Sequence, residues 1–272
     1  MFELLTAPLR YDFMLRGLGA GILAAIACAA LSCFVVWRGW AFIGDALAHT
    51  MLPGIVLAQA SGIGLIFGAL IASIFSVLGI GAIKNKSNLR EDSAIGIIFA
   101  GFFALGILLL STLSGLQDLS HILFGNILGV SNNDLVLLAI VTAIILIVLK
   151  LGFKELLTAS FDPAHASAIG LSPGFIRYLL LVLLALTTVV AVQAVGVVLV
   201  VALLVTPAAS ASLLTRKLET TIVLSFVFAL TATIIGFYIS YYTDLTSGPV
   251  IVLTLISFFC VSMAVSHFRQ SR

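Results

Sequence analysis

Long apolar runs follow one another along this chain with few charges between them. Hydrophobic residues make up 62% of the 272 positions and charged residues 9%, whereas soluble domains carry roughly 25% charged residues. Inside a bilayer every backbone polar group must be hydrogen-bonded within the protein, so only helices or a closed barrel can cross it. Because the runs are continuous rather than alternating, they favour helices. We therefore expect an all-α fold, a polytopic transmembrane helical bundle.

The apolar runs are long enough for about 8–9 membrane spans. The second run is interrupted by Pro53 and Gly54, and the sixth and seventh meet at residues 193–196. If one of these is a broken or re-entrant helix, eight full crossings remain. The whole chain, residues 1–272, is expected to form a single transmembrane domain. The expected spans cover residues 17–37, 41–60, 62–83, 93–113, 134–152, 175–194, 195–214, 220–242 and 248–267.

Asp45 and His49 stand four residues apart in an otherwise apolar stretch. At this spacing two side chains share one face of a helix, and a carboxylate with an imidazole suits Mn, Fe or Zn. Ionisable residues inside a membrane are costly and indicate function. Two structural roles stay open: Asp45 could complement the positive end of a helix starting near Ala41, and His49 could be a hydrogen-bonded core residue. Because His49 would lie roughly 12 Å along that helix, a metal or proton role is favoured.

The basic residues fall mostly in alternate loops. With the N-terminus outside and the C-terminus in the cytoplasm, eleven Lys and Arg residues are cytoplasmic and two are external. The positive-inside rule selects this orientation over its inverse.

Two polar segments lie between the spans. Residues 113–134 are too polar to cross and predict an external interfacial helix or a dip into a pore mouth; His121 within them is either a solvated histidine or a transient metal contact. On the cytoplasmic side, Asp162 can cap a helix whose first residue is Pro163, and Gly170 can end it. This short element offers a surface to a partner, and His165 faces water or that partner.

No motif in the sequence indicates covalent chemistry. There is no P-loop and no His-Glu-x-x-His run, so we expect a transport subunit rather than an enzyme. Uphill transport would then draw its energy from ATP hydrolysis in a separate subunit or from an ion gradient.

Several motifs together resemble the permease subunits of bacterial ABC importers for manganese, zinc and iron, the metal-ion ABC-3 permease family. The signature is an arginine, then Gly-Asp-x-x-x-His, then a Leu-Pro-Gly turn. In this chain it consists of Arg38, Gly44-Asp45 with His49, and Leu52-Pro53-Gly54. The likeness continues in residues 90–96, 121–126 and 196–209, and covers most of the chain.

The resemblance implies a type II ABC importer-like bundle in a bacterial plasma or inner membrane. Two copies would pair around a central path lined by Asp45 and His49 of each chain. The implied partners are an ABC ATPase, an extracytoplasmic metal-binding lipoprotein or periplasmic protein, a second copy of the chain and membrane lipid, but no nucleic acid. No cofactor is expected to be bound permanently, since the divalent metal is the cargo.

The same resemblance suggests where an ATPase would dock. In related cobalamin and siderophore permeases a Pro-x-x-x-Arg region leads into the coupling helices. This places the main coupling surface at residues 212–220, with Arg216 and Lys217, and a second part at Asp162, His165 and Gly170. The alternative is that both are ordinary loops.

Manganese is the favoured cargo, with zinc and iron as alternatives. Residues 52–54 and 91–96 look more like the manganese and iron branch of the family. The lack of a thiolate beside Asp45 and His49 also suits a harder cation. The competing hypotheses are a proton-coupled secondary metal transporter without an ATPase, in which Asp45 and His49 relay protons, and a membrane scaffold, which would need neither residue.

Overall fold

The computed structural model describes residues 10–87, 89–112 and 127–270, and this part of the chain is built from helices. Eight of the described helices are long and apolar enough to cross a membrane, which confirms the expected all-α membrane bundle. They are α2 (Asp12–Arg38), α5 (Leu65–Lys86), α6 (Glu91–Thr112), α8 (Asn132–Leu151), α11 (Pro173–Val195), α12 (Val197–Leu214), α13 (Leu218–Thr243) and α14 (Ser247–Gln270). Shorter elements are α3 (Ile43–Thr50), α4 (Leu52–Ser61), the 3-10 turn η2 (Ile127–Gly129), α9 (Phe153–Phe161) and α10 (Pro163–Ala168).

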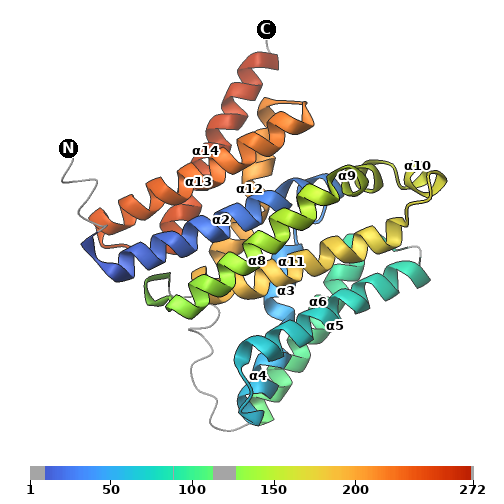
Figure 1. The fold of residues 1–272 in the computed structure, drawn as a ribbon, viewed down its shortest axis with the longest axis horizontal. Helices are drawn as coiled ribbons and strands as arrows, with labels where there is room; N and C mark the ends of the chain where they lie inside the picture. The colour runs from blue at the N-terminus through green and yellow to red at the C-terminus, as the bar shows by residue number, and fades with distance from the viewer. Residues whose placement is uncertain (1–9, 88, 113–126, 271–272) are drawn as a thin grey trace.

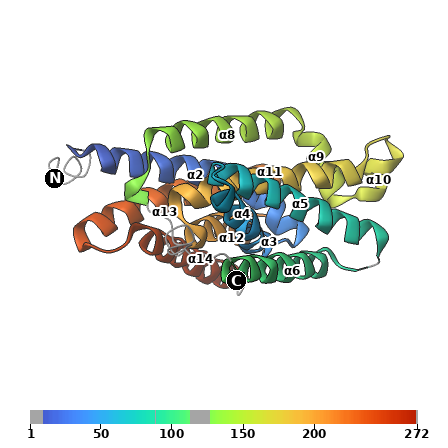
Figure 2. The ribbon, with the colours of Figure 1, turned by 90° about the horizontal axis from the view of Figure 1, so that it is seen from below.

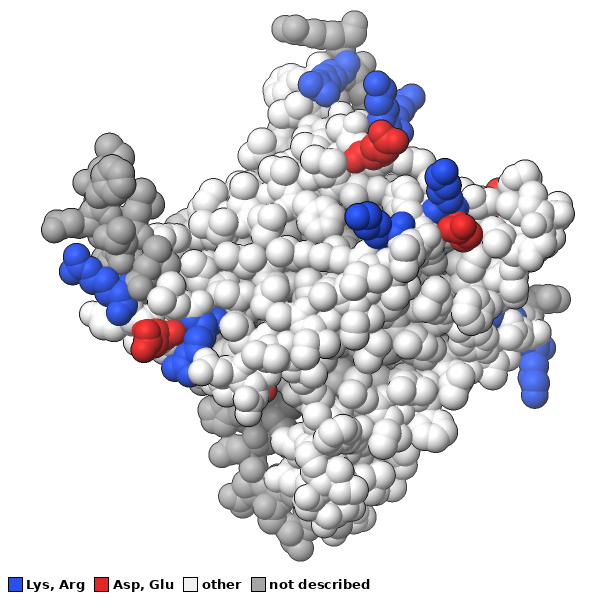
Figure 3. Space-filling model, viewed as in Figure 1, with Lys and Arg blue, Asp and Glu red and all other residues white. Residues whose placement is uncertain are grey.

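The helix ends sort into two groups at opposite ends of the bundle (Figure 1). One group, here called the basic end, contains the ends of α2, α5, α8, α12 and α14 and the starts of α6, α11 and α13. Long-range contacts hold it together: Arg38 donates to Ser160 of α9, and Arg177 of α11 donates to Asn85 of α5. In the visible face of Figure 3, most charged residues lie in the upper part and at the sides, and the centre and the region below it are uncharged.

The second apolar run is a broken helix, one of the two forms that its Pro-Gly pair left open, but it crosses the bundle, unlike the expectation that a break would leave eight crossings. The helix α3 ends at Thr50, Met51 lies at the junction, and α4 begins at Leu52 with Pro53 in its first turn. Trp40, just before α3, bonds to Glu91 at the basic end, while α5 returns to that end from the opposite one. The two short helices therefore carry the chain across together. Their combined length of about 27 Å is close to a hydrocarbon core of roughly 30 Å.

The sixth and seventh runs are two separate spanning helices joined by one residue. Gly196 has a φ of 89°, a backbone conformation that side chains other than hydrogen strongly disfavour. It ends α11 and precedes α12, so the chain reverses direction without a loop.

The core lies where α2, α11 and α12 meet. Figure 2 shows α8 on one outer side of the bundle and α14 and α6 on the other, with α2, α11 and α12 between them. In its most apolar window α2 is 72% buried, against 17% for α6. Small residues make this possible: Ala20, Ala24 and Ala27 of α2 are fully buried, so their short side chains let neighbouring helices come close. Close approach of this kind gains the dispersion contacts that hold membrane helices together.

A proline inside α12 is accommodated by a side chain from α2. Pro207 supplies no backbone N–H and disturbs the helical bonding around it. The N–H of the next residue, Ala208, donates to the hydroxyl of Ser32 at 3.2 Å, and both residues are buried. This bond ties α12 to α2 at the residue that follows the proline.

Gly54 and Gly68 let α4 and α5 pack backbone against backbone. A Cβ added to either glycine would overlap the other's carbonyl oxygen. Gly54, the glycine of the Leu-Pro-Gly turn, is therefore needed for the close packing of α4 against α5. The same turn fixes α6, because Leu52 fills the space that a side chain at Gly106 would need.

Replacing Gly68 by Ala should destabilise the folded chain, because the new methyl would overlap the carbonyl of Gly54. Overpacking of this kind typically costs about 1–3 kcal/mol. The measurement is the thermal unfolding midpoint of the purified chain in detergent. Gly96→Ala is the matched control, since nothing lies within 4 Å of the added Cβ. Equal midpoints for the two variants would contradict the close contact of α4 and α5.

Candidate metal site

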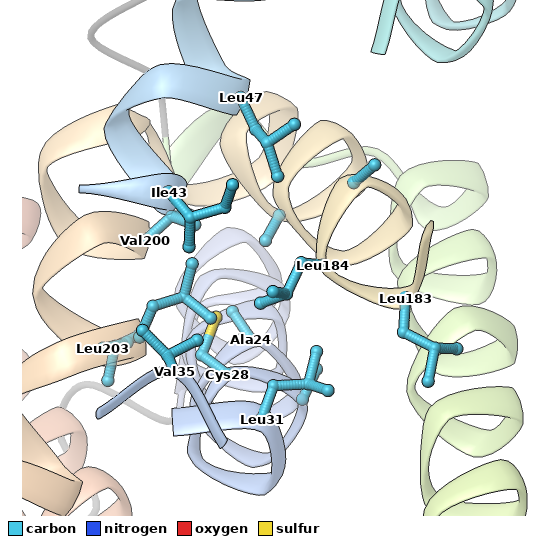
Figure 4. Packing of buried hydrophobic residues seen from close by; sticks show 14 of the residues in the cluster. Ala24, Cys28, Leu31, Val35, Ile43, Leu47, Leu183, Leu184, Val200 and Leu203 are labelled. Carbon is cyan, nitrogen blue, oxygen red and sulfur yellow. The ribbon is translucent and has the colours of Figure 1, made fainter. Parts of the chain in front are cut away.

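Packing on one face of α3 decides where its polar residues point. Ile43 and Leu47 are fully buried among side chains of α2, α11 and α12 (Figure 4). Gly44 brings the helix close to α12, because a Cβ there would meet a methyl of Leu204 at 2.8 Å. At about 100° per residue, Asp45 and His49 lie on the side turned away from this contact. The apolar face thus anchors the helix and presents the carboxylate and the imidazole together.

The structure brings Asp45 and His49 within reach of a common ligand. His49 Nε2 lies 3.5 Å from Asp45 Oδ1, and the two side chains are 24% and 33% exposed, respectively. Two ligand atoms that each lie near 2.1 Å from a metal ion are roughly 3.0 Å apart at a right angle and 3.4 Å apart at a tetrahedral angle. The observed separation therefore suits a shared divalent cation with little rearrangement. Partial exposure gives an ion a way in.

Aromatic rings from α6 form one wall of the site. The ring of His49 makes edge contacts with Phe99 and Phe103, whose centroids are 5.8 Å and 5.2 Å away. Those two rings stack on each other, and Phe42 contacts Phe99 from the start of α3. His49 Nδ1 is buried and has no hydrogen-bond partner within the described part of the chain. Packing against the rings thus orients the imidazole, in place of the hydrogen bond that usually fixes a ligand histidine.

The helix begins later than the sequence predicted. It starts at Ile43 rather than near Ala41, so Asp45 is in its first turn and His49 in its last. Trp40 causes the shift, because its backbone N–H bonds to Val35 and its indole bonds to Glu91, which holds the preceding residues in a turn. A helix-end role for Asp45 therefore stays open. His49 stands roughly 9 Å along the helix, beside the break.

One chain contributes two candidate ligands at this position. Among the described residues, no group of three or more His, Cys, Asp or Glu side chains is close enough to hold a metal. A complete coordination shell would therefore need water, backbone oxygens or a second chain. His121, the other histidine predicted near a pore mouth, lies outside the described residues.

A partly buried polar cluster at the basic end connects the start of α3 to three other elements. The guanidinium of Arg38 donates to Ser160 Oγ at 3.1 Å and to the carbonyl of Ala159 at 3.2 Å. It also lies over the ring of Trp40, 5.0 Å from the centroid. Arg38, the first residue of the signature, thus bonds to α9.

Glu91 is the carboxylate of this cluster. It accepts a 2.5 Å hydrogen bond from Trp40 Nε1, and its other oxygen lies 3.7 Å from Arg177 Nη1. Sequence reasoning did not identify this residue as a partner, because Trp40 and Arg177 lie far from it along the chain. The sequence does indicate that these residues could meet, because Glu91, Arg38 and Arg177 all stand at the ends of predicted spans on the same side of the membrane.

The remaining predicted residues lie on the surface of the basic end. Asp162 Oδ1 accepts from the backbone N–H of His165 at 2.9 Å, and Gly170 follows the helix with a φ of 86°. The predicted capping of this short helix is therefore confirmed. Arg216 and Lys217 form the turn between α12 and α13. The helix α10 packs on α9 and α11, whereas α12 and α13 pack on α2 and α14, so the two parts of the predicted coupling surface rest on different helices.

Comparison with known proteins places the chain in a family. The sequence profile of the ABC 3 transport family matches residues 10–266. The chain belongs to this family. The expected family is thereby confirmed, on the same residues that carry the Asp45–His49 pair.

Proteins from several bacteria are similar to the chain over nearly its full length. The chain is 42% identical over 269 residues to a probable iron transport system membrane protein of Haemophilus influenzae, covering 99% of each sequence. It is 41% identical to the manganese transport system membrane protein MntB of Synechocystis, covering 95% of this chain and 85% of that protein.

Two solved structures share the fold. PsaBC from Streptococcus pneumoniae, solved in complex with a Fab, matches with a TM-score of 0.83 and 40% identity over 96% of this chain and 94% of that one. An inward-facing putative metal-chelate type ABC transporter matches with a TM-score of 0.74 at 16% identity, over 92% of this chain and 85% of that one. The second likeness concerns the fold alone. The chain is thus a multi-pass membrane protein with the fold of ABC transporter membrane subunits.

Separating Trp40 from Glu91 should destabilise the basic end. The variant Trp40→Phe removes the indole donor, and Glu91→Gln removes the charge but keeps an acceptor. A hydrogen bond to a charged group contributes about 1.5–3 kcal/mol, so each variant should unfold more readily. The double variant should lose less than the sum, because the partners act as a pair.

Unfolding in detergent, compared across the two single variants and the double variant, measures this coupling. Asp92→Asn is the control, because Asp92 is an exposed neighbour of Glu91 in the first turn of α6. Strictly additive losses would show that Trp40 and Glu91 do not act on each other.

Proposed function

We propose that this chain is the membrane subunit of an ATP-driven importer of divalent metal ions, with Mn²⁺ as the favoured cargo. The proposal rests on the Asp45–His49 pair. The two side chains lie 3.5 Å apart on a broken helix whose other face packs into the core. Asp45 neutralises and binds the cation, and His49 adds a nitrogen ligand of intermediate softness. The chain itself hydrolyses no ATP; that reaction belongs to a separate subunit.

The choice of cargo rests on the ligands. A carboxylate and an imidazole without a thiolate suit Mn²⁺ and Fe²⁺, whereas Cys ligands select softer metals. The names of the similar proteins divide between iron and manganese, and both metals fit this ligand set. Manganese is favoured because it is the harder of the two.

A second copy of the chain would complete the site. One chain offers two ligands that remain partly exposed, and α6, whose rings contact His49, is the least buried of the candidate spans. A partner placed symmetrically would bring its own Asp45 and His49 to a shared path. Two pairs, with water, supply enough ligands for a transition-metal ion while leaving it free to depart.

The ATPase would seat on the basic end. The proposed coupling surface consists of Asp162, His165 and Gly170 around α10 together with Arg216 and Lys217 at the turn between α12 and α13. In Figure 1 the α10 segment projects from the bundle at this end. An extracytoplasmic metal-binding lipoprotein or periplasmic protein would deliver the ion to the opposite end.

The polar cluster gives the coupling surface a route to the metal pair. The helix α9 directly precedes α10, and its Ser160 accepts a hydrogen bond from Arg38. Arg38 in turn packs on Trp40, the residue that sets the start of α3. A displacement of α9 by the ATPase would therefore be passed to the helix that carries Asp45 and His49. The proton-coupled alternative has no comparable support, because the chain belongs to an ABC transport family.

Replacing Asp45 by Asn should abolish metal uptake. The change keeps the size and hydrogen bonding of the side chain but removes the charge that offsets a divalent cation. If Asp45 only complements a helix end, worth about 0.3–1 kcal/mol when exposed, Asn should preserve transport, since it too is favoured at helix starts. The measurement is Mn²⁺ uptake by the complete transporter in liposomes, with Fe²⁺ and Zn²⁺ as competitors.

Asp92→Asn provides the matched control, because it makes the same chemical change at an exposed site in α6. It should transport normally. Expression, dimer formation and ATPase association must be unchanged in both variants for the comparison to hold. Near-normal uptake by Asp45→Asn would falsify the proposed role of this residue.

We also propose that the basic end faces the cytoplasm, which places the N-terminus outside and the C-terminus inside. A cysteine at Lys86 should then be shielded from an impermeant thiol reagent added to intact cells, whereas one at Asn133 should react. Both positions are exposed, at the basic end and at the opposite end respectively. The native cysteines, Cys28, Cys33 and Cys260, must first be replaced. The reverse labelling pattern would overturn this orientation and the proposed ATPase surface with it.

A further inference from the structure

An apolar groove runs along the outside of the bundle between α13 and α14, starting from the basic end. Its volume is about 510 Å³. The two helices that form it pack directly on each other, since Gly236 leaves no room for a side chain against the backbone of Ile251. The lining residues on α13 are Thr220, Leu224 and Phe228, and those on α14 are Phe258, Val261, Ser262, Val265 and Arg269.

The groove has the length of one membrane leaflet. From Thr220 to Phe228 along α13 is about 12 Å, and from Phe258 to Arg269 along α14 about 17 Å. Half of a hydrocarbon core is roughly 15 Å. The rings of Phe228 and Phe258, with centroids 5.9 Å apart, mark its far end. A single acyl chain would fit along this length.

A polar cavity of about 360 Å³ adjoins the groove at its basic end. The two share Leu214, Thr215 and Arg269. The residues Ser212, Arg216 and Ser266 complete the polar part of its lining. An apolar slot thus opens directly into a compartment lined with hydrogen-bond donors.

The polar cavity carries positive charge. Among the described residues, its lining includes Arg216 and Arg269 and no carboxylate, and the nearby Glu219 does not line either cavity. Arg269 is held in place by a hydrogen bond from Nη1 to the carbonyl of Leu214 at 3.3 Å. A guanidinium has five N–H donors, so this bond leaves most of them for a ligand.

We propose that this site binds an anionic phospholipid, with the phosphate between Arg216 and Arg269 and one acyl chain in the groove. Basic pockets between membrane helices at a cytoplasmic surface recognise acidic headgroups in this way. Free phosphate would gain nothing from the groove, and a neutral lipid would leave both arginines uncompensated. The site is distinct from the Asp45–His49 pair, and the proposal does not depend on which cargo is transported.

The test measures lipid binding by the purified full-length chain in neutral detergent. The probes are fluorescent phosphatidylglycerol and phosphatidylcholine with the same acyl chains. Arg269→Gln should weaken phosphatidylglycerol binding about fivefold, because one arginine near an anionic membrane surface contributes about that factor to the affinity. It should leave phosphatidylcholine binding unchanged. Lys154→Gln, an exposed basic residue elsewhere at the same end, is the matched control and should change neither. Arg216 is left intact because it belongs to the proposed ATPase surface.

A second variant tests the groove independently of charge. Val261→Trp should fill the slot and weaken binding of both lipids, while soluble glycerophosphate should fail to displace phosphatidylglycerol from the wild-type chain. Equal affinity of the wild type for the two lipids, an unchanged Arg269→Gln variant, or full displacement by glycerophosphate would each overturn the proposal. Loss of dimers, rather than of lipid, in Val261→Trp would show that a second copy covers the groove. These assays need neither metal nor ATPase, so they remain informative if the proposed transport function fails.

Discussion

A helix that stops inside a membrane must find partners for its backbone, and the break between α3 and α4 depends on this requirement. No water is present in lipid to bond the exposed groups, so an interruption is tolerated only where protein surrounds it. Met51 at the break is fully buried, its carbonyl accepts from Ile55, and the hydroxyl of Thr50 donates to Leu47. The helices α5, α6, α11 and α12 enclose the two pieces. Protein packing thus allows a short, separately oriented helix to carry two ionisable side chains.

Those side chains occupy an environment between water and lipid. Burial makes an ionised carboxylate costly unless a counter-charge is present, while the aromatic wall around His49 excludes polar partners on one side. Partial exposure of Asp45 keeps the cost moderate. A site that conducts ions must attract them and also release them. If Asp45 and His49 bind the transported ion, as proposed, two ligands per chain would meet both needs better than the closed four-ligand site of a structural metal.

The sequence predicted the features that depend on local pattern. Continuous apolar runs located the spans, Pro53-Gly54 located the break, and the four-residue spacing placed Asp45 beside His49. It missed what depends on distant partners. The helix starts at Ile43 because Trp40 bonds to Glu91, a residue 51 positions away, and no local pattern encodes such a pair. Likewise, Gly44 is needed because a side chain there would collide with Leu204 of α12. Such packing partners become visible only when the fold is known.

The single-residue turn at Gly196 has a mechanical consequence. Because α11 and α12 are joined there without slack, they cannot slide past each other at that end. A relative motion of the two helices would therefore be a rotation about the junction. An arm as long as α12, about 27 Å for its 18 residues, turned through about ten degrees would carry its tip roughly 5 Å. Any such rotation would displace the basic end of the pair most, because that end lies farthest from the junction.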